Sequence, residues 1–305
     1  MFDVLIVGGG PAGLMAGIYA KRAGRNVAII EKFIAGGQLN LIGEIENYLG
    51  FPKIQGSSLA EKFTNHALSL EVPIIYDEIT DYSLDGETKI LTGRKDKYQA
   101  LSVILAQGCH SKELNIDGEA KFKGRGVSYC AVCDGNFFKG KDVAVVGSGD
   151  SAFSDALYLS SICNHVYVLT KENLKLHNYA ENEFDGKDNI TLKKGAISQR
   201  ILGDQNINEI VYEEKGEEGH LAVEGVFVAI GRTPDTTALN GKLVMNERGY
   251  IVANEKMQTS VEGVFVCGDV REGSIAQIST AVGDGAVAGT EASKYVLINL
   301  SKRNK

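Results

Sequence analysis

Two cysteines separated by two residues form the part of the sequence best suited to chemistry. Cys130 and Cys133 are followed directly by Asp134. Two thiols at this spacing can close a small disulfide ring, and a neighbouring carboxyl group can manage the proton of a leaving thiolate. The pattern predicts a redox-active dithiol, and the alternatives are a zinc site or a pair of inert thiols.

A zinc site would need two further ligands at a matching spacing. The other cysteines, Cys109, Cys163 and Cys267, stand alone in the sequence, and the five histidines form no cluster along it. Cys163 and Cys267 lie in apolar segments and are predicted to be core residues. We therefore expect no metal site.

A glycine-rich turn near the N-terminus has the form that binds a dinucleotide. Residues 8–13 read GGGPAG and fit G-x-G-x-x-G between a β-branched run and a helical pattern. In such a turn the first glycine permits the bend, the second admits a pyrophosphate, and the third lets helix and strand pack closely. Glu31 ends the next predicted strand, where a carboxylate can accept hydrogen bonds from ribose hydroxyl groups.

The same pattern returns in the middle of the chain. Residues 143–152 read VAVVGSGDSA, and residues 4–13 read VLIVGGGPAG. Each run is followed by a helical pattern and then by a buried strand, at 14–23 with 26–31 and at 151–161 with 165–170. These are two βαβ units, which predict two nucleotide-binding domains. The second turn has the form G-x-G-x-x-A, which a duplicated domain can retain after losing its ligand.

Length and composition agree with two folded domains. The 305 residues include 44% hydrophobic and 23% charged side chains, which permits a sizeable core and excludes intrinsic disorder. The net charge of −7 disfavours nucleic-acid binding, which needs a basic face. No apolar run approaches the roughly 20 residues that cross a bilayer. The N-terminus enters a strand without a basic leader, so we expect a cytoplasmic protein with no membrane partner.

The remaining segments complete an α/β pattern. Strands are expected at 101–106, 225–230 and 263–267, polar hairpins at 194–225, and a long helix at 281–300. Gly268-Asp269 follows the last of these strands. An aspartate in that place can bind a hydroxyl group of a ligand, although it could equally be a turn residue.

Taken in order, the motifs resemble those of the low-molecular-weight thioredoxin reductases, over essentially the whole chain. They are GGGPAG at 8–13 with Glu31, GGQL at 36–39, ENY at 46–48, AQG at 106–108, CAVCDG at 130–135, GRTPDT at 231–236, GDV at 268–270 and AQISTAVG at 276–283. The resemblance implies an α/β fold of two Rossmann-like, three-layer βαβ nucleotide-binding domains, the second inserted in the first. Residues 1–115 and 246–305 would form the FAD domain, and residues 116–245 an inserted NAD(P)-like domain that carries the Cys-x-x-Cys. The family also implies a homodimer.

The resemblance further implies which residues meet FAD and which act on the substrate. The FAD contacts carried over are Gly8, Gly10, Pro11, Ala12, Gly13, Glu31, Gly37, Gln38, Asn47, Ile79, Ala106, Gly108, Asp269, Ala276, Gln277 and Ile278. Electrons would pass from FAD to the Cys130–Cys133 disulfide and then to thioredoxin. Cys133 would lie against the flavin, Cys130 would attack the thioredoxin disulfide, and Asp134 would serve as acid and base.

One motif of the family is altered in this chain. The family holds the 2′-phosphate of NADPH with His-Arg-Arg-x-x-x-Arg after the second strand of the insert, whereas residues 170–176 read TKENLKL here. Arginine pairs with phosphate in bidentate fashion, whereas Glu172 carries the opposite sign and Leu176 replaces the final arginine. A ferredoxin-dependent flavin variant of the family shows a similar loss, so we predict ferredoxin as the donor. The alternatives are NADH, whose free 2′-hydroxyl suits Glu172, and weakly bound NADPH.

Functions of other classes are disfavoured by the same resemblance. A peroxidase-linked reductase of the superfamily would carry an additional N-terminal redox domain, and the relatives that reduce ferredoxin lack the dithiol. A non-catalytic flavin-binding redox sensor is the remaining alternative. The intact CAVCDG sequence argues against it, because a sensor has no need to cycle two thiols.

Overall fold

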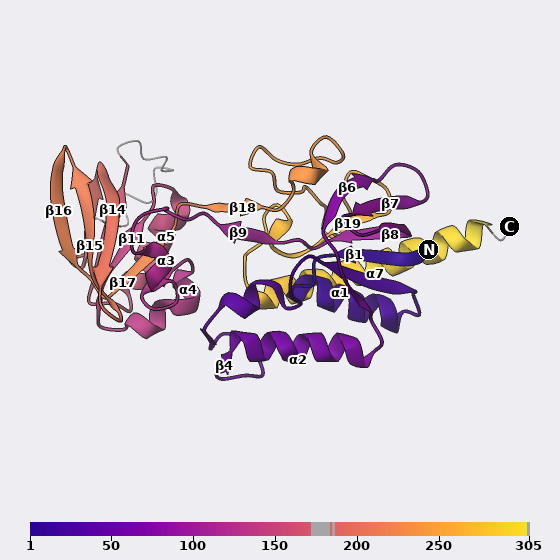
Figure 1. Cartoon of the computed structure of the whole chain (residues 1–305), viewed down its shortest axis with the longest axis horizontal. Helices are drawn as coiled ribbons and strands as arrows, with labels where there is room; N and C mark the ends of the chain where they lie inside the picture. Colours follow the sequence, from indigo (N-terminus) through magenta and orange to yellow (C-terminus); the bar gives the residue numbers. More distant parts are fainter. Residues whose placement is uncertain (172–183, 185–186, 304–305) are drawn as a thin grey trace. The chain divides into compact units, whose positions relative to one another are not determined.

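The chain passes from one folded unit into a second and back into the first (Figure 1). The computed structural model describes residues 1–171, 184 and 187–303. Unit 1 consists of Met1–His110 and Thr233–Lys305, and unit 2 consists of Ser111–Arg232. The two crossings run through β9 (Cys109–Ser111) and β18 (Arg232–Pro234), which pair with one another.

Unit 1 is built on a mixed sheet in the order β5-β2-β1-β8-β7-β6, with β19 also paired to β8. The strands are β1 (Phe2–Val7), β2 (Val27–Glu31), β5 (Ile74–Tyr76), β6 (Ile79–Ser83), β7 (Lys89–Gly93), β8 (Lys97–Leu105) and β19 (Val264–Val266). Strand β1 is parallel to β2 and β8, whereas β6, β7 and β8 are antiparallel. Every residue of β2 is buried, as expected for a parallel strand whose two faces are covered.

The helices of unit 1 include α1 (Pro11–Arg22), α2 (Gly56–Ser69) and α7 (Ile278–Arg303). Helices α1 and α7 approach each other closely because small residues face each other. A β-carbon added at Gly285 would lie 2.2 Å from the carbonyl oxygen of Ala12, and one added at Gly289 would lie 2.5 Å from that of Ala16. Shorter elements of this unit are η1 (Gly37–Leu41), β3 (Glu44–Ile45), β4 (Ile54–Gln55), η3 (Thr237–Leu239) and η4 (Gly268–Val270).

Unit 2 contains a parallel sheet in the order β10-β17-β11-β12-β13 and an antiparallel sheet of β14, β15 and β16. The strands of the parallel sheet are β10 (Val127–Ser128), β11 (Asp142–Val146), β12 (His165–Thr170), β13 (Ile190–Lys194) and β17 (Gly225–Val228). The antiparallel strands are β14 (Ala196–Gly203), β15 (Ile207–Glu214) and β16 (Glu217–Ala222). Helices of the described part of this unit include α3 (Glu119–Phe122), α4 (Ala131–Asp134), η2 (Gly135–Phe138) and α5 (Asp150–Ser160).

The predicted α/β class with two Rossmann-like units is confirmed, because β1-α1-β2 and β11-α5-β12 are each parallel βαβ units. Two helices begin earlier than expected. Helix α1 begins at Pro11, whose fixed φ suits the first helical position, rather than at residue 14. Helix α7 begins at Ile278 rather than at residue 281. Strand β7 was not expected from the sequence.

The chain passes between the units at residues 110–111 and 232–233, and the domain bounds near 115 and 245 that the resemblance implied stay a prediction. Residues 233–245 belong to unit 1, because Leu239 is fully buried in a core that also contains Tyr82. Residues 111–115 belong to unit 2, where Leu114 packs against a core that contains Phe122. Packing of these short segments, which have no periodic pattern, therefore sets the boundaries.

Within the described part of the chain, no helix has both the length and the apolar character needed to cross a membrane.

Candidate functional site

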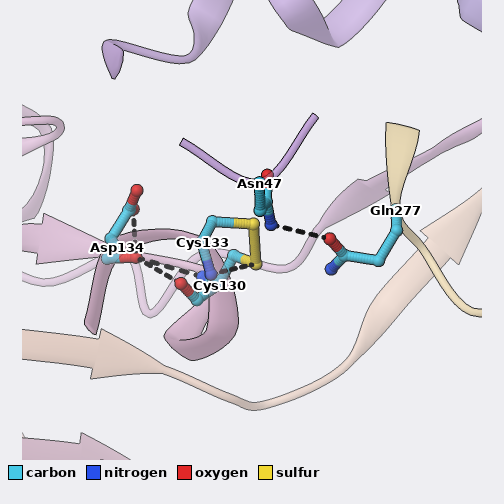
Figure 2. The surroundings of a disulfide bond; sticks show 6 residues. Asn47, Cys130, Cys133, Asp134 and Gln277 are labelled. Carbon is cyan, nitrogen blue, oxygen red and sulfur yellow. Dashed lines mark hydrogen bonds between the residues drawn. A yellow bond between two sulfur atoms is a disulfide. The ribbon is translucent and has the colours of Figure 1, made fainter. Parts of the chain in front are cut away.

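The two cysteines of the Cys-x-x-Cys are joined in a disulfide (Figure 2). Cys130 is in extended backbone conformation and caps α4, which places its Cα 5.3 Å from that of Cys133. The Cys133 amide donates a hydrogen bond of 3.3 Å to Cys130 Sγ. One turn of helix therefore holds both sulfur atoms within the distance of a disulfide bond.

Asp134, the last residue of α4, lies beside this disulfide and is held by a serine. The Ser128 hydroxyl donates a 2.6 Å hydrogen bond to Asp134 Oδ2. Burial raises the pKa of Asp134 above its ordinary value, and the Ser128 hydrogen bond lowers it by less. A carboxyl group with a raised pKa retains its proton closer to neutral pH, so Asp134 is suited to exchange protons with thiols.

The first glycine-rich turn makes close backbone contacts that a larger residue would block. Gly8 has a φ of +106°, and a β-carbon on it would lie 2.3 Å from the carbonyl oxygen of Ala106. A β-carbon on Gly13 would lie 1.9 Å from the oxygen of Gly8. At Gly10 the added atom would meet nothing within 4 Å, so this side of the turn is open. The turn has room for a phosphate at the start of α1, where backbone N–H groups are unpaired.

Glu31 is placed at the edge of this turn by β2 and is 8% exposed. Its Oε2 accepts the Gly9 amide at 2.7 Å, and its Oε1 accepts the Phe33 amide at 2.8 Å. Each carboxylate oxygen retains a second lone pair for another donor. The open turn with a fixed acceptor beside it fits the pyrophosphate and ribose of a dinucleotide, so these residues fit FAD.

Residues of the next segment reach the same region of unit 1. Gly37 lies against the turn, because a β-carbon on it would be 3.1 Å from the Cα of Gly10. The Gln38 side-chain amide donates to the carbonyl oxygen of Cys109, which follows Gly108. Asn47 Nδ2 donates a 3.2 Å hydrogen bond to Gln277 Oε1 (Figure 2). Residues that are far apart in the sequence are thus brought together in unit 1.

Asp269 lies in η4, directly after β19, and its turn packs on the start of α1. A β-carbon on Gly268 would lie 2.9 Å from Ala12 Cβ, and Gly268 has a φ of +74°. The Cys109 thiol lies 3.9 Å from Asp269 Oδ2 as a weak hydrogen-bond donor. The structure therefore places Asp269 beside the glycine-rich turn. A single ligand that contacts both Asp269 and the turn requires this arrangement.

Four further predicted contacts occupy the ends of elements. Pro11 is the first residue of α1, Ala276 and Ile278 flank Gln277 at the start of α7, and Ile79 begins β6. Ile79 is partly buried against the core that contains Val7 and Ile30.

The remaining cysteines behave as core residues. Cys109, Cys163 and Cys267 are buried and take no part in the disulfide. Burial, followed by the charge of Asp142, raises the pKa of Cys163 to about 11. Burial also raises the pKa of Cys267. The prediction that Cys163 and Cys267 are core residues is confirmed. Among the described residues, no group of three or more His, Cys, Asp or Glu side chains could hold a metal ion.

The second glycine-rich turn repeats the backbone approach of the first. A β-carbon on Gly147 would lie 2.4 Å from the oxygen of Ala229, the counterpart of the contact between Gly8 and Ala106. The Ser148 hydroxyl oxygen accepts the Lys171 amide at 2.9 Å and the Thr170 hydroxyl at 3.0 Å. Glu172 and Leu176, on which the donor prediction rests, lie outside the described residues.

Two polar residues near these sites were not identified from the sequence. Ser128 holds Asp134, and Asp284 holds the turn of Asp269 by accepting the Gly268 amide at 3.2 Å and Arg271 Nε at 2.9 Å. Neither belongs to a motif with a recognisable spacing, and only the fold brings each residue to its partner.

Known proteins are similar to this chain over almost its whole length. A model of the pyridine nucleotide-disulphide oxidoreductase family matches residues 2–285. Thioredoxin reductase of Bacillus subtilis is 37% identical over 303 residues, which cover 97% of this chain and 95% of the relative. The structure of thioredoxin reductase from Streptococcus pyogenes matches with a TM-score of 0.92 and 36% identity over 97% of this chain and 98% of that chain. A ferredoxin-flavin thioredoxin reductase from Clostridium acetobutylicum matches with a TM-score of 0.54 and 33% identity over 97% of this chain and 98% of that chain.

Proposed function

The chain belongs to the pyridine nucleotide-disulphide oxidoreductases and, among them, to the FAD-dependent thioredoxin reductases, and on this premise we propose that it reduces the disulfide of thioredoxin. The observation that carries the proposal is the Cys130–Cys133 disulfide, with the carboxyl group of Asp134 held in the same turn of helix. A non-catalytic flavin sensor would have no use for this arrangement.

Unit 1 supplies the residues that would hold FAD. The open turn at Gly10 would take the pyrophosphate, Glu31 would accept from a ribose hydroxyl, and Asp269 would bind the ribityl chain. The start of α7, with Gln277 next to it, would complete the site. FAD, when bound and reduced, supplies the electron pair that opens the Cys130–Cys133 disulfide.

The exchange with thioredoxin then proceeds between sulfur atoms. Cys130 attacks one sulfur of the thioredoxin disulfide, so the bond between the two thioredoxin sulfurs breaks and a mixed disulfide forms. Cys133 then attacks Cys130 Sγ, which closes the Cys130–Cys133 bond and releases thioredoxin with two thiols. Asp134 takes the proton of each attacking thiol and returns it to each leaving thiolate. Two electrons and two protons pass to thioredoxin.

Single cysteine variants test these roles. Cys133→Ser should bind FAD but release no reduced thioredoxin, because the mixed disulfide on Cys130 has no thiol to resolve it. We expect this variant, once its Cys130 thiol is free, to form a covalent complex with thioredoxin through Cys130, detected by mass spectrometry. Cys130→Ser should form none, and Cys163→Ala, which removes a core thiol, should behave as the unchanged protein. A covalent complex through Cys133, or full thioredoxin reduction by either active-site variant, would contradict the assignment.

We also propose that ferredoxin, rather than NADPH, delivers the electrons. The support is the sequence at 171–176, in which Glu172 and Leu176 stand where the family has arginines, together with the similarity to a ferredoxin-flavin thioredoxin reductase. Two reduced ferredoxins would supply one electron each. NADH or weakly bound NADPH are the competing donors.

Anaerobic mixing with each donor distinguishes them. The holoprotein is mixed with NADPH, NADH and photoreduced ferredoxin in turn, and bleaching of the flavin band is followed. Dithionite serves as the control that the flavin can be reduced. Bleaching by ferredoxin alone supports the proposal, whereas rapid bleaching by NADPH or NADH contradicts it.

The homodimer implied by the family and the expected cytoplasmic location are part of the same proposal. Sedimentation equilibrium of the holoprotein should give about twice the 32.8 kDa of the chain. A monomer across the working concentration range would remove the dimer from the proposal.

A further inference from the structure

Ser128 forms hydrogen bonds with both Asp134 and Cys130 at the dithiol site. It is 4% exposed on β10, and its hydroxyl donates to Asp134 Oδ2 at 2.6 Å. The same oxygen accepts the backbone amide of Cys130 at 3.1 Å. One buried hydroxyl group therefore contacts both the carboxyl group of Asp134 and the backbone of the attacking cysteine.

The single proton of this hydroxyl has two acceptors within reach. Asp134 Oδ2 lies at 2.6 Å, and the carbonyl oxygen of Cys130 lies at 3.4 Å. The shorter contact is the stronger one, and a hydrogen bond to an ionised carboxylate is about twice as strong as one between neutral groups. The hydroxyl therefore stabilises Asp134 most when the carboxyl group has lost its proton.

We propose that Ser128 is a positioning residue for thiol–disulfide exchange, which aims the Asp134 carboxyl group and stabilises its ionised form while holding the Cys130 backbone. This inference rests on the proposed function, because it assigns the proton transfers of the exchange to Asp134. Without Ser128 the carboxyl group would hold its proton more tightly and would lose its fixed orientation relative to Cys130.

Among the described residues, no charged group of the neighbouring elements influences the pKa of Asp134. Burial and the Ser128 hydroxyl are the influences on the pKa of Asp134. Helix α5, against which α4 packs, carries Asp150, Asp155 and Tyr158, none of which contributes. Segment η2, which reads GNFF, and β10, which reads VS, carry no titratable side chain. Burial raises the pKa of Asp155 to about 6, so a pH profile of the exchange rate has to separate the titration of Asp155 from that of Asp134.

The first test measures the titration of Asp134 directly, without thioredoxin. The ¹³C NMR signal of the Asp134 carboxyl group is identified as the one that disappears in Asp134→Asn. Its chemical shift is then followed against pH in the oxidised holoprotein. We expect Ser128→Ala to move this titration to higher pH by about one unit, because a hydrogen bond to a charged group is lost. Ser128→Thr keeps a hydroxyl and should restore the original titration. The matched control is Ser160→Ala, because Ser160 is a buried serine whose hydroxyl donates to Leu157 instead.

The second test measures the exchange reaction. The rate at which the reduced protein reduces thioredoxin is recorded against pH in an Asp155→Asn background. In this pH profile of the rate, the pH-dependent limb that Asp134→Asn abolishes should move to higher pH in Ser128→Ala. In Ser128→Thr it should return to its original pH. An unchanged titration in Ser128→Ala, or a Thr variant that titrates like Ala, would overturn the inference. Failure of the unchanged protein to reduce thioredoxin would instead refute the proposed function. The NMR titration of Asp134 uses no thioredoxin, so it tests the role of Ser128 separately.

Discussion

The carboxylate of Glu31 is held in place by two backbone amides. Its two oxygens each accept one backbone amide, from Gly9 and from Phe33, so its rotamer is set by the turn and by the end of β2. A group held in this way loses little conformational freedom when a ribose hydroxyl donates to it. We therefore expect the side chain to contribute to FAD binding through its charge and through its fixed orientation.

Replacing Glu31 by glutamine should weaken FAD binding. The amide nitrogen of glutamine would face a backbone N–H, and the ribose would lose a charged acceptor. A hydrogen bond to a charged group is worth about 1.5–3 kcal/mol, so the Kd for FAD should rise roughly 10- to 150-fold. Titration of the apoprotein with FAD measures this, with Glu61→Gln on the exposed face of α2 as the control. An unchanged Kd in Glu31→Gln would remove Glu31 from the site.

At the level of elements, the site depends on the packing of α1 against α7. Helix α1 begins at the glycine-rich turn, and α7 begins next to Gln277, so both helices present predicted FAD contacts at their N-termini. Gly285 and Gly289 carry no β-carbon, so the backbones of α1 and α7 lie closer together than a larger residue at either position would allow. The separation of the two helices therefore sets the spacing of the groups that would hold FAD.

Two glycine substitutions on α7 should have opposite effects. Gly285→Ala would place a β-carbon 2.2 Å from the oxygen of Ala12, which forces the helices apart and should reduce the free energy of unfolding by about 1–3 kcal/mol. Gly283→Ala meets nothing within 4 Å and should raise the free energy of unfolding by about 0.4–1 kcal/mol. Urea unfolding of both holoproteins measures the difference. Equal effects of the two substitutions would contradict the packing argument.

The elements that the sequence predicted are those with a strong local pattern. The strands around Val4 and Val143 were recognisable from their β-branched runs and the glycine turns that follow them. Strands β6 and β7 have mixed exposure and pair locally in an antiparallel manner, so their pattern is weak. The contacts of Ser128 and Asp284 arise from packing between separate elements, and no spacing in the sequence could reveal them.

For the whole molecule, the two units have separate cores. Buried clusters that include Ile6 and Val266 belong to unit 1, and clusters that include Val145 and Ile210 belong to unit 2. Each unit has its own βαβ core and the chain crosses between them twice. A ligand that binds in one unit should therefore stabilise that unit directly.

Calorimetry should accordingly show two unfolding transitions with different ligand responses. FAD at 100 times its Kd should stabilise unit 1 by about 2.7 kcal/mol and raise its transition by roughly 5–10 °C. The transition of unit 2 should not move with FAD or, under the ferredoxin proposal, with NADH or NADPH. A single transition that moves with FAD would contradict the independence of the units. Movement of the second transition with NADPH would show that the insert binds this nucleotide.

The most direct test of the central claim is a single-turnover thiol count that does not depend on the identity of the donor. The holoprotein is photoreduced under anaerobic conditions and mixed with excess oxidised thioredoxin, and the new thiols on thioredoxin are counted after rapid alkylation. We predict two new thioredoxin thiols for each pair of electrons that the holoprotein took up in photoreduction, with the Cys130–Cys133 pair returned to the disulfide. Return of the pair to the disulfide without new thiols on thioredoxin, or no reaction at all, would contradict the assignment of this chain as a thioredoxin-reducing enzyme.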